Sequence, residues 1–358
     1  RMVVADGAGS GAAITDVLDV LGGTGNIALG SGAMGTALTT GTDNVAIGEN
    51  ALDAVTSGAD NTAVGDNAAG ATTTGANNTA IGSSAFLVNS TGSANTSIGA
   101  YALDANTTAD DNTAVGYAAL SANSTGSQNT AVGRNALLAN TTGTYNVAVG
   151  YNALDANTTA SNNVAVGNAA LTANTSGTDN VAVGDSALDA NTTGSDNTAI
   201  GDNALGANTT AAKNTAVGSG ALTANVTGDL NTALGFNALA TNTVGDRSVA
   251  IGYQALLTQE PSSNTDMLNT AVGFDAMKVS TTGVQNASFG SYTLDANTTG
   301  SYNVAVGHSA LSANTTASHN VAVGVVALTA NTTGASNVAV GNYALDALTT
   351  VSNLTAVG

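Results

Sequence analysis

Few side chains in this sequence could carry out chemistry. The chain has two histidines, no cysteine, and 24 acidic residues against five basic ones. His308 and His319 stand 11 residues apart, a spacing that does not readily assemble a nucleophile, a base and an orienting group. The glycines recur too regularly to single out a phosphate-binding loop. We therefore predict no enzyme activity and no bound cofactor.

A metal site is the next chemistry to consider, because aspartate directly precedes asparagine at Asp111, Asp179 and Asp196. Carboxylate and amide oxygens are ligands that calcium uses in proteins. The calcium-loaded β-roll repeat, however, has a denser Gly-Gly-x-Gly-x-Asp pattern, which this sequence lacks. We interpret these aspartates as solvated acidic corners and predict no metal site.

Asparagine recurs in two regularly spaced columns. One column is followed by Thr-Thr and matches the N-glycosylation acceptor pattern. In a parallel stack, however, identical side chains lie about 4.8 Å apart, so that amides can bond to one another and to corner backbone groups. We predict a structural ladder, with glycosylation as the alternative. Representative residues are Asn146, Asn163 and Asn180 in the first column and Asn140, Asn157 and Asn191 in the second.

A repeat of 17 residues must position all these side chains. It opens with Asn-(Thr/Val)-Ala-(Val/Ile)-Gly, as in Asn146–Gly150, and about 19 units follow one another from Asn26 to a partial copy that ends at Gly358. A complete unit is NVAVGDSALDANTTGSD, residues 180–196. A fixed period held this long predicts a stacked repeat, and the alternation at positions 2 and 4 predicts a short strand over positions 1–4. The expected fold is all-β, a parallel β-solenoid.

The rest of the unit has one large apolar residue, leucine at position 9, between alanines at positions 8 and 11. We predict a second short strand or an irregular extended piece here, with a single helical turn as the alternative, because seven residues are too few for an independent helix. The aliphatic residues at positions 2, 4 and 9 are expected to form a thin core. The alanine columns at positions 3, 8 and 11 are expected to let another chain approach closely, which favours a homotrimer.

Charge is confined to a few positions of the repeat. In the regular units, charged residues fall at positions 6, 7, 10, 16 and 17, which indicates solvated corners. The formal net charge of −19 disfavours nucleic acid and anionic membrane surfaces as partners. No apolar run approaches the roughly 20 residues of a membrane span. We therefore predict neither nucleic-acid binding nor membrane insertion.

Candidate ligand contacts lie at aromatic corners and in one insertion. The aromatic candidates share position 6 and are Tyr117, Tyr151, Tyr253 and Phe274. The unit that starts at Ser248 is four residues longer than the others, and insertions in repeat proteins become protruding loops. This loop, near residues 258–268, contributes Glu260, Pro261 and Asp266. The alternatives are aromatic rings that pack across coils or chains, and a loop that binds nothing.

Residues 1–25 do not follow the repeat. Ile14, Val17, Leu18 and Leu21 have helical spacing, and Gly22 and Gly23 follow as a stop signal. We predict a short helix that caps the stack or begins a neck, with a partly ordered linker as the alternative. The repeat domain then covers residues 26–358.

The repeat resembles those of known fibrous proteins. Its Asn-x-Ala-(Val/Ile)-Gly core, as at Asn146–Gly150, resembles the head repeats of trimeric autotransporter adhesins, which wind left-handed parallel β-rolls within a trimer. The form with Ala-Leu-x-Ala-Asn-Thr-Thr-Gly is similar to repeat tracts of phage tail fibres and bacterial surface fibres that end in an endosialidase-type chaperone. The resemblance covers residues 26–358. It implies an extracellular shaft or head, on a cell surface or virion, whose three chains present weak multivalent contacts to surface glycans.

Two other functions remain open. A self-assembling extracellular filament without a receptor would follow if the ends of the solenoid stack on one another. An ice-binding solenoid would follow if the threonines at positions 13 and 14 form an ordered array, although adjacent residues of an extended segment point to opposite faces and a Thr-x-Thr rank is missing there.

Overall fold

The computed structural model describes residues 24–358, and the chain divides into two compact units at residues 162 and 163. The predicted helix at Ile14–Leu21 lies outside the described residues. Unit 1 contains β1 (Ile27–Leu29), β2 (Val45–Ile47), β3 (Thr62–Val64), β4 (Thr79–Ile81), β5 (Thr96–Ile98), β6 (Thr113–Val115), β7 (Thr130–Val132) and β8 (Val147–Val149).

Unit 2, residues 163–358, is built in the same way. Its repeat strands are β9 (Val164–Val166), β10 (Val181–Val183), β11 (Thr198–Ile200), β12 (Thr215–Val217), β13 (Thr232–Leu234), β15 (Val249–Ile251), β17 (Thr270–Val272), β18 (Ala287–Phe289), β19 (Val304–Val306), β20 (Val321–Val323), β21 (Val338–Val340) and β22 (Thr355–Val357). Two further short strands are β14 (Gly245–Asp246) and β16 (Thr265–Asp266). Between residues 24 and 358 there is no helix, and hence none that could cross a membrane.

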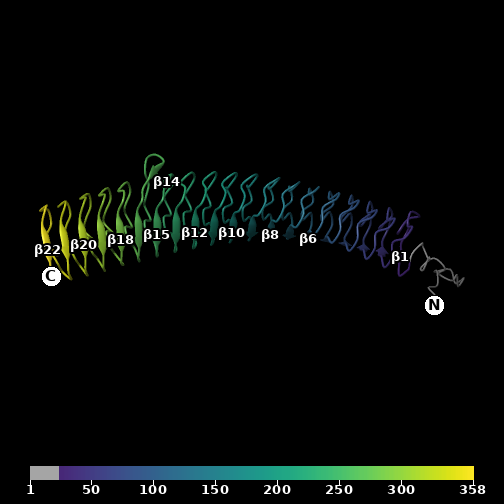
Figure 1. The fold of residues 1–358 in the computed structure, drawn as a ribbon, viewed down its shortest axis with the longest axis horizontal. Coiled ribbons are helices and arrows are strands. Elements are labelled where there is room, and N and C mark those ends of the chain that lie inside the picture. The colour runs from purple at the N-terminus through teal and green to yellow at the C-terminus, as the bar shows by residue number, and fades with distance from the viewer. Residues whose placement is uncertain (1–23) are drawn as a thin grey trace, which may run out of the picture. The chain divides into compact units, whose positions relative to one another are not determined.

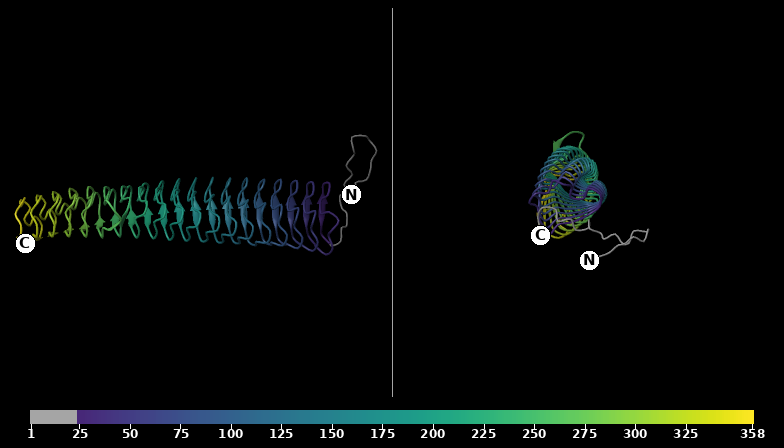
Figure 2. Two further views of the ribbon diagram at one scale, coloured as in Figure 1. Left: turned by 90° about the horizontal axis from the view of Figure 1, so that it is seen from above. Right: turned by 90° about the vertical axis from the view of Figure 1, so that its right-hand side faces the viewer.

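Both units are parallel β-solenoids. Within each unit, each repeat strand pairs in parallel and in register with the next one, as Thr113 with Thr130 in unit 1 and Val181 with Thr198 in unit 2. Within each unit the strands therefore line up along one side of the coils (Figure 1, and Figure 2, left). The prediction of a parallel β-solenoid with about 19 coils of 17 residues is confirmed.

The predicted arrangement of the strand faces is wrong. Positions 2 and 4 do share a face, but that face is the outer one: in β10, Val181 and Val183 are half-buried whereas Ala182 between them is fully buried. The core of this coil consists of Ala182, Ala187 and Leu188. Two buried asparagines per coil take up the rest of the interior, as Asn180 and Asn191 do, so that only a small side chain fits at position 3, alanine in most coils and serine at Ser97 and Ser288.

The second half of the coil is a series of turns, so the predicted second strand is also wrong. Residues at positions 7, 9 and 17 have positive φ, for example Ser186 at 50°, Leu188 at 55° and Asp196 at 60°. This left-handed conformation costs a non-glycine residue roughly 1–2 kcal/mol. It is offset by hydrogen bonds to the next coil, such as Leu188 N–H to the carbonyl of Ala204 at 3.0 Å.

Glycine at position 5 is required where the strand ends. Gly184 has φ of 139°, and a Cβ there would lie 2.5 Å from the carbonyl oxygen of Gly201 in the next coil. Left-handed φ and close backbone contact both exclude other residues.

The insertion is built into the stack at its base. Gln259 occupies the place of the position-12 asparagine, donating to Asn242 Oδ1 at 3.2 Å and accepting from Asn269 Nδ2 at 3.0 Å. Strand β16 pairs in parallel with β14. Residues 262–264 are exposed and form the loop that rises beside β14 in Figure 1.

Candidate binding surfaces

The two histidines are parts of ring stacks on separate corners. His308 lies edge-on to Tyr292, with ring centroids 5.8 Å apart, and His319 stacks on Tyr302 at 4.9 Å. The neighbour of His308 on its own coil is Ser309, whose hydroxyl lies 3.1 Å from Nδ1. Among residues 24–358 no group of three His, Asp or Glu side chains could hold a metal ion.

Asparagine ladders run through the interior of both units. In the position-1 column, Asn180 Nδ2 donates to Asn163 Oδ1 at 3.2 Å and to the carbonyl of Gly194 at 2.9 Å. Asn146 makes the corresponding bonds to Asn129 and Ala160. Buried amides that bond in this way join each coil to the next and satisfy corner carbonyls that would otherwise be orphaned.

The position-12 column forms a second ladder of the same kind. Asn157 Nδ2 donates to Asn140 Oδ1 at 2.9 Å in unit 1, and Asn191 Nδ2 donates to Asn174 Oδ1 at 3.0 Å in unit 2. Asn140, Asn157 and Asn191 are fully buried. A glycan could not be attached to these amides without opening the fold.

A row of aromatic rings crosses five coils of unit 2. Tyr253 stacks between Phe236 and Phe274, with centroids 5.5 and 5.0 Å apart and planes within 13° and 7° of parallel. Tyr292 and His308 continue the row edge-on. Because the stacked rings cover one another, Tyr253 presents its edge to solvent, although it is 43% exposed. Tyr253 and Phe274 thus pack against each other across neighbouring coils, which is the alternative to ligand contact that the sequence left open.

The tyrosine candidates of unit 1 are more open. Tyr117 meets Tyr101 edge-on at 6.0 Å, and the Arg134 guanidinium lies 5.7 Å from the centroid of the Tyr117 ring. Tyr151 is 50% exposed and has no ring contact within the described part of the chain. Among the described residues, Tyr151 is therefore the position-6 aromatic candidate on which no other ring and no cation stacks.

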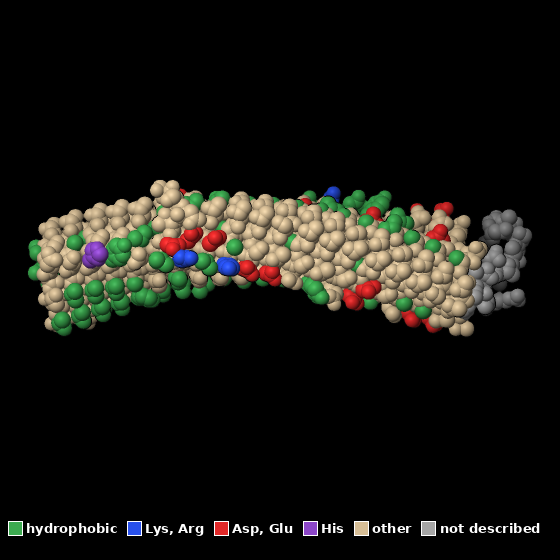
Figure 3. All heavy atoms as spheres, turned by 45° about the horizontal axis from the view of Figure 1, so that its top comes forward, with side chains coloured by type: hydrophobic (Ala, Val, Ile, Leu, Met, Phe, Trp, Pro, Cys, Tyr) green, Lys and Arg blue, Asp and Glu red, His purple; other side chains and the backbone are tan. Residues whose placement is uncertain are grey.

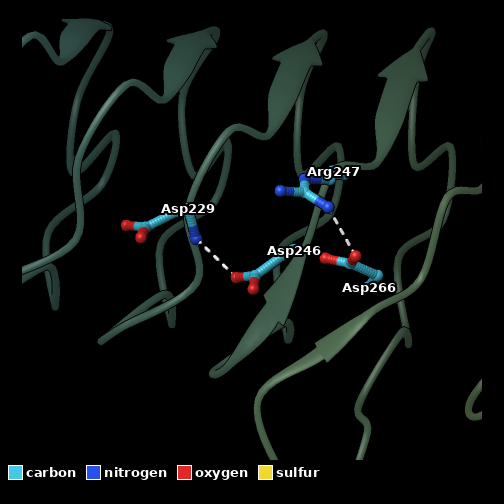
Figure 4. Close-up of polar contacts among 4 residues, drawn as sticks. All are labelled: Asp229, Asp246, Arg247 and Asp266. Carbon is cyan, nitrogen blue, oxygen red and sulfur yellow. Dashed lines mark hydrogen bonds and ion pairs between the residues drawn. The ribbon is translucent and has the colours of Figure 1, made fainter.

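Charged side chains gather beside the insertion (Figures 3 and 4). Asp246 Oδ1 accepts the backbone N–H of Asp229 at 2.7 Å, and Arg247 forms an ion pair with Asp266 (Figure 4). Figure 3 shows acidic and basic side chains next to each other on this face. Burial, with the nearby charges of Asp229 and Asp266, raises the pKa of Asp246.

The three loop candidates have different surroundings. Asp266 is exposed and paired as described, and Glu260 is exposed and accepts a hydrogen bond from the Thr243 hydroxyl at 2.6 Å. Pro261 is buried against Gly245. Pro261 therefore supports the base of the loop and does not offer a surface to a ligand.

Sequence reasoning missed the outer strand face, which we define as the position-2 and position-4 side chains of the repeat strands. It carries no charged residue in any repeat. Part of it in unit 2 is the valine strip, defined as Val304, Val306, Val321, Val323, Val338 and Val340 of β19–β21. Hydrophobic side chains form rows on the part of unit 2 nearest the C-terminus in Figure 3. Alternation predicted that these residues share a face but could not tell which face lies outward.

A second group of half-buried side chains is acidic. Four aspartates at position 10 have their pKa raised above the ordinary value of 3.8, chiefly because burial disfavours the charged form, and backbone hydrogen bonds oppose this in part. These residues are Asp104, Asp155, Asp189 and Asp295.

No protein-family model matches the chain, and no curated protein matches it.

Proposed function

We propose that this chain is a non-enzymatic structural segment of an extracellular fibre, built from three copies that associate through the valine strip of unit 2. The observation that carries the proposal is the valine strip. Val304, Val306, Val323 and Val340 are each 36–37% exposed. Contiguous exposed apolar side chains on a soluble protein mark interaction sites.

The chemistry of the strip favours a second copy of the chain as its partner. The centres of protein interfaces are depleted of charge, and positions 2 to 4 carry none, whereas the corners of the same coils bear acidic residues. With a net charge of −19, copies would repel one another at their corners and attract only along an uncharged face. The valine strip would therefore provide the contact between copies of the chain, and the repulsion between corners would fix how the copies face one another.

Three copies are proposed because the repeat resembles that of trimeric adhesin heads and because a closed ring leaves no apolar face exposed. The sequence suggested that the alanine columns form the contact between chains. We propose the valine strip in their place, because the alanines at positions 3 and 8 are buried inside each coil. Each chain would hold the weak site once, so that one particle would present it three times, which raises the avidity of the particle.

Surface glycans are the ligands that we propose for such sites, with Tyr151 as the contact. An aromatic ring with a free face can pack against the apolar face of a sugar while its hydroxyl bonds to water or ligand. Tyr253, which has a ring stacked on each side, lacks such a free face.

Paired substitutions test the assembly and the ligand separately. Val321→Lys with Val323→Lys places charge on the strip and is expected to reduce the particle to a monomer in sedimentation velocity. Thr333→Lys, at an exposed position of the same coil, is expected to leave the trimer intact. If the valine variant keeps the wild-type mass, the strip is not the interface; if wild-type mass grows without limit, the chain is a filament.

The ligand test uses glycan-coated surfaces. Tyr151→Ala is expected to shorten the residence of the protein on the surface, and Tyr253→Ala is expected to leave it unchanged. Equal loss in both variants, or no loss in either, would reject Tyr151 as the contact.

A further inference from the structure

The outer strand face changes its chemistry in unit 1, where five consecutive coils carry threonine at position 2. We define the threonine rank as Thr62, Thr79, Thr96, Thr113 and Thr130 of β3–β7. Each is followed two residues later by an aliphatic side chain on the same face, as Thr96 is by Ile98. The face thus has one row of hydroxyl groups beside one row of methyl-bearing side chains.

The hydroxyls of the rank are free. Within the described residues none of the five makes a hydrogen bond, and all five side chains are half-buried. The threonines at position 13 differ, because their hydroxyls donate to a carbonyl of the next coil, as Thr107 does to Ser124 at 3.1 Å and Thr141 to Thr158 at 2.9 Å. A free hydroxyl on the rank must find its partner in water.

The rank is also regular in two directions. The strands pair in register, Thr79 with Thr96 and Thr113 with Thr130, so that hydroxyls repeat at about 4.8 Å across the sheet. Along each strand, the threonine and the aliphatic residue are two residues apart, roughly 6.6 Å. The repeat across the sheet is close to the shorter spacing between water oxygens on the prism face of hexagonal ice.

We propose that the threonine rank binds ice. Methyl groups restrict the orientation of first-shell water, and free hydroxyls at lattice spacing give the ordered water fixed hydrogen-bond partners. No charged side chain lies on β3–β7 to disturb that order. The threonine rank differs from the array of position-13 and position-14 threonines that the sequence suggested. The hydroxyls at position 13 already donate to carbonyls of the next coil, and the exposed threonines at position 14 form a single row on a turn.

The test is the partition of the full chain into slowly growing ice, together with thermal hysteresis. Thr96→Tyr with Thr113→Tyr puts two bulky rings on the rank, and tyrosine is well tolerated in strands. The matched control is Thr108→Tyr with Thr125→Tyr, exposed position-14 residues of the same two coils. Far-UV circular dichroism and urea unfolding verify that both variants keep the fold.

The expected result is that the wild-type chain and the position-14 variant are taken up by ice and show hysteresis, whereas the rank variant is excluded like an ordinary soluble protein. Exclusion of the wild-type chain from ice overturns the proposal. It is also overturned if the rank variant is retained as well as the wild type, or if the position-14 variant loses uptake to the same degree.

Discussion

Breaking the position-12 ladder in the middle of unit 2 should destabilise the fold far more than the size of one side chain suggests. Asn191 donates to Asn174 Oδ1 and to the carbonyl of Gly194, each at 3.0 Å, and accepts from Asn208 Nδ2 at 2.9 Å. It is fully buried. Asn191→Leu keeps the number and branching of the side-chain heavy atoms and removes all three side-chain bonds, so it tests hydrogen bonding without leaving a cavity.

The magnitude follows from what stays paired after the substitution. The Gly194 carbonyl still accepts from Asn180 Nδ2 at 2.9 Å, and Asn208 Nδ2 still donates to the Ala211 carbonyl at 3.1 Å. Two of the three groups that lose a hydrogen bond to Asn191 are thus partly satisfied. At about 1–3 kcal/mol for a buried polar group left unpaired, we expect Asn191→Leu to lower the free energy of unfolding by about 3 kcal/mol.

The assay is equilibrium urea unfolding, combined with native-state hydrogen exchange because stacked repeats need not unfold in one step. Protection should fall most in the coils that contain residues 174–208. Thr193→Ala, at an exposed position two residues away, should change stability by no more than about 0.5 kcal/mol. If Asn191→Leu is as stable as the wild type, the ladder does not hold the coils together and the reasoning fails.

Three further predictions concern the core, the end of the ladder and pH. Ala182→Leu should overpack the narrow interior and cost about 1–3 kcal/mol in urea unfolding, whereas Val181→Thr on the outer face should stay within about 0.5 kcal/mol; equal costs would contradict the assignment of the faces. Asn331 Oδ1 is buried without a partner, and the next coil has Leu348 at position 12, so Leu348→Asn should raise the stability by about 1 kcal/mol; a lower melting temperature would count against this. Burial raises the pKa of four position-10 aspartates, Asp104, Asp155, Asp189 and Asp295, above 3.8. At pH values between the unfolded-state pKa and the raised folded-state pKa, each of them binds more protons in the folded state than in the unfolded state. The free energy of unfolding should therefore fall as pH rises through that window, and Asp189→Asn should reduce the slope; a stability that rises with pH there would refute the sign.

The 17-residue period predicted the coil, the parallel stacking and the asparagine ladders, because each depends only on identical residues meeting at a fixed offset. Asn180 and Asn191 show this directly, since each bonds to the asparagine 17 residues before it. The orientation of the strand was predicted wrongly, because alternation fixes which side chains share a face and leaves open which face is inside. That choice depends on the width of the coil, which Leu188 and the two buried asparagines determine together.

The turns could not be predicted from residue preferences. Leu188 adopts φ of 55°, a conformation in which leucine is rare, because hydrogen bonds to the next coil offset its cost. Among the candidate contacts, position in the repeat indicated exposed corners correctly for Tyr117 and Tyr151. It could not show that Tyr253 and Phe274 stack on each other, since this depends on which neighbouring coils also carry a ring.

The measurement that tests the proposed assembly most directly is the molar mass of the 34.2 kDa chain in solution, by light scattering behind size exclusion over a range of concentrations. Association of three chains through the valine strip predicts a mass near three times 34.2 kDa that does not change on dilution. A mass near 34.2 kDa at every concentration would contradict it, because the valine strip would then be exposed to water in the native protein.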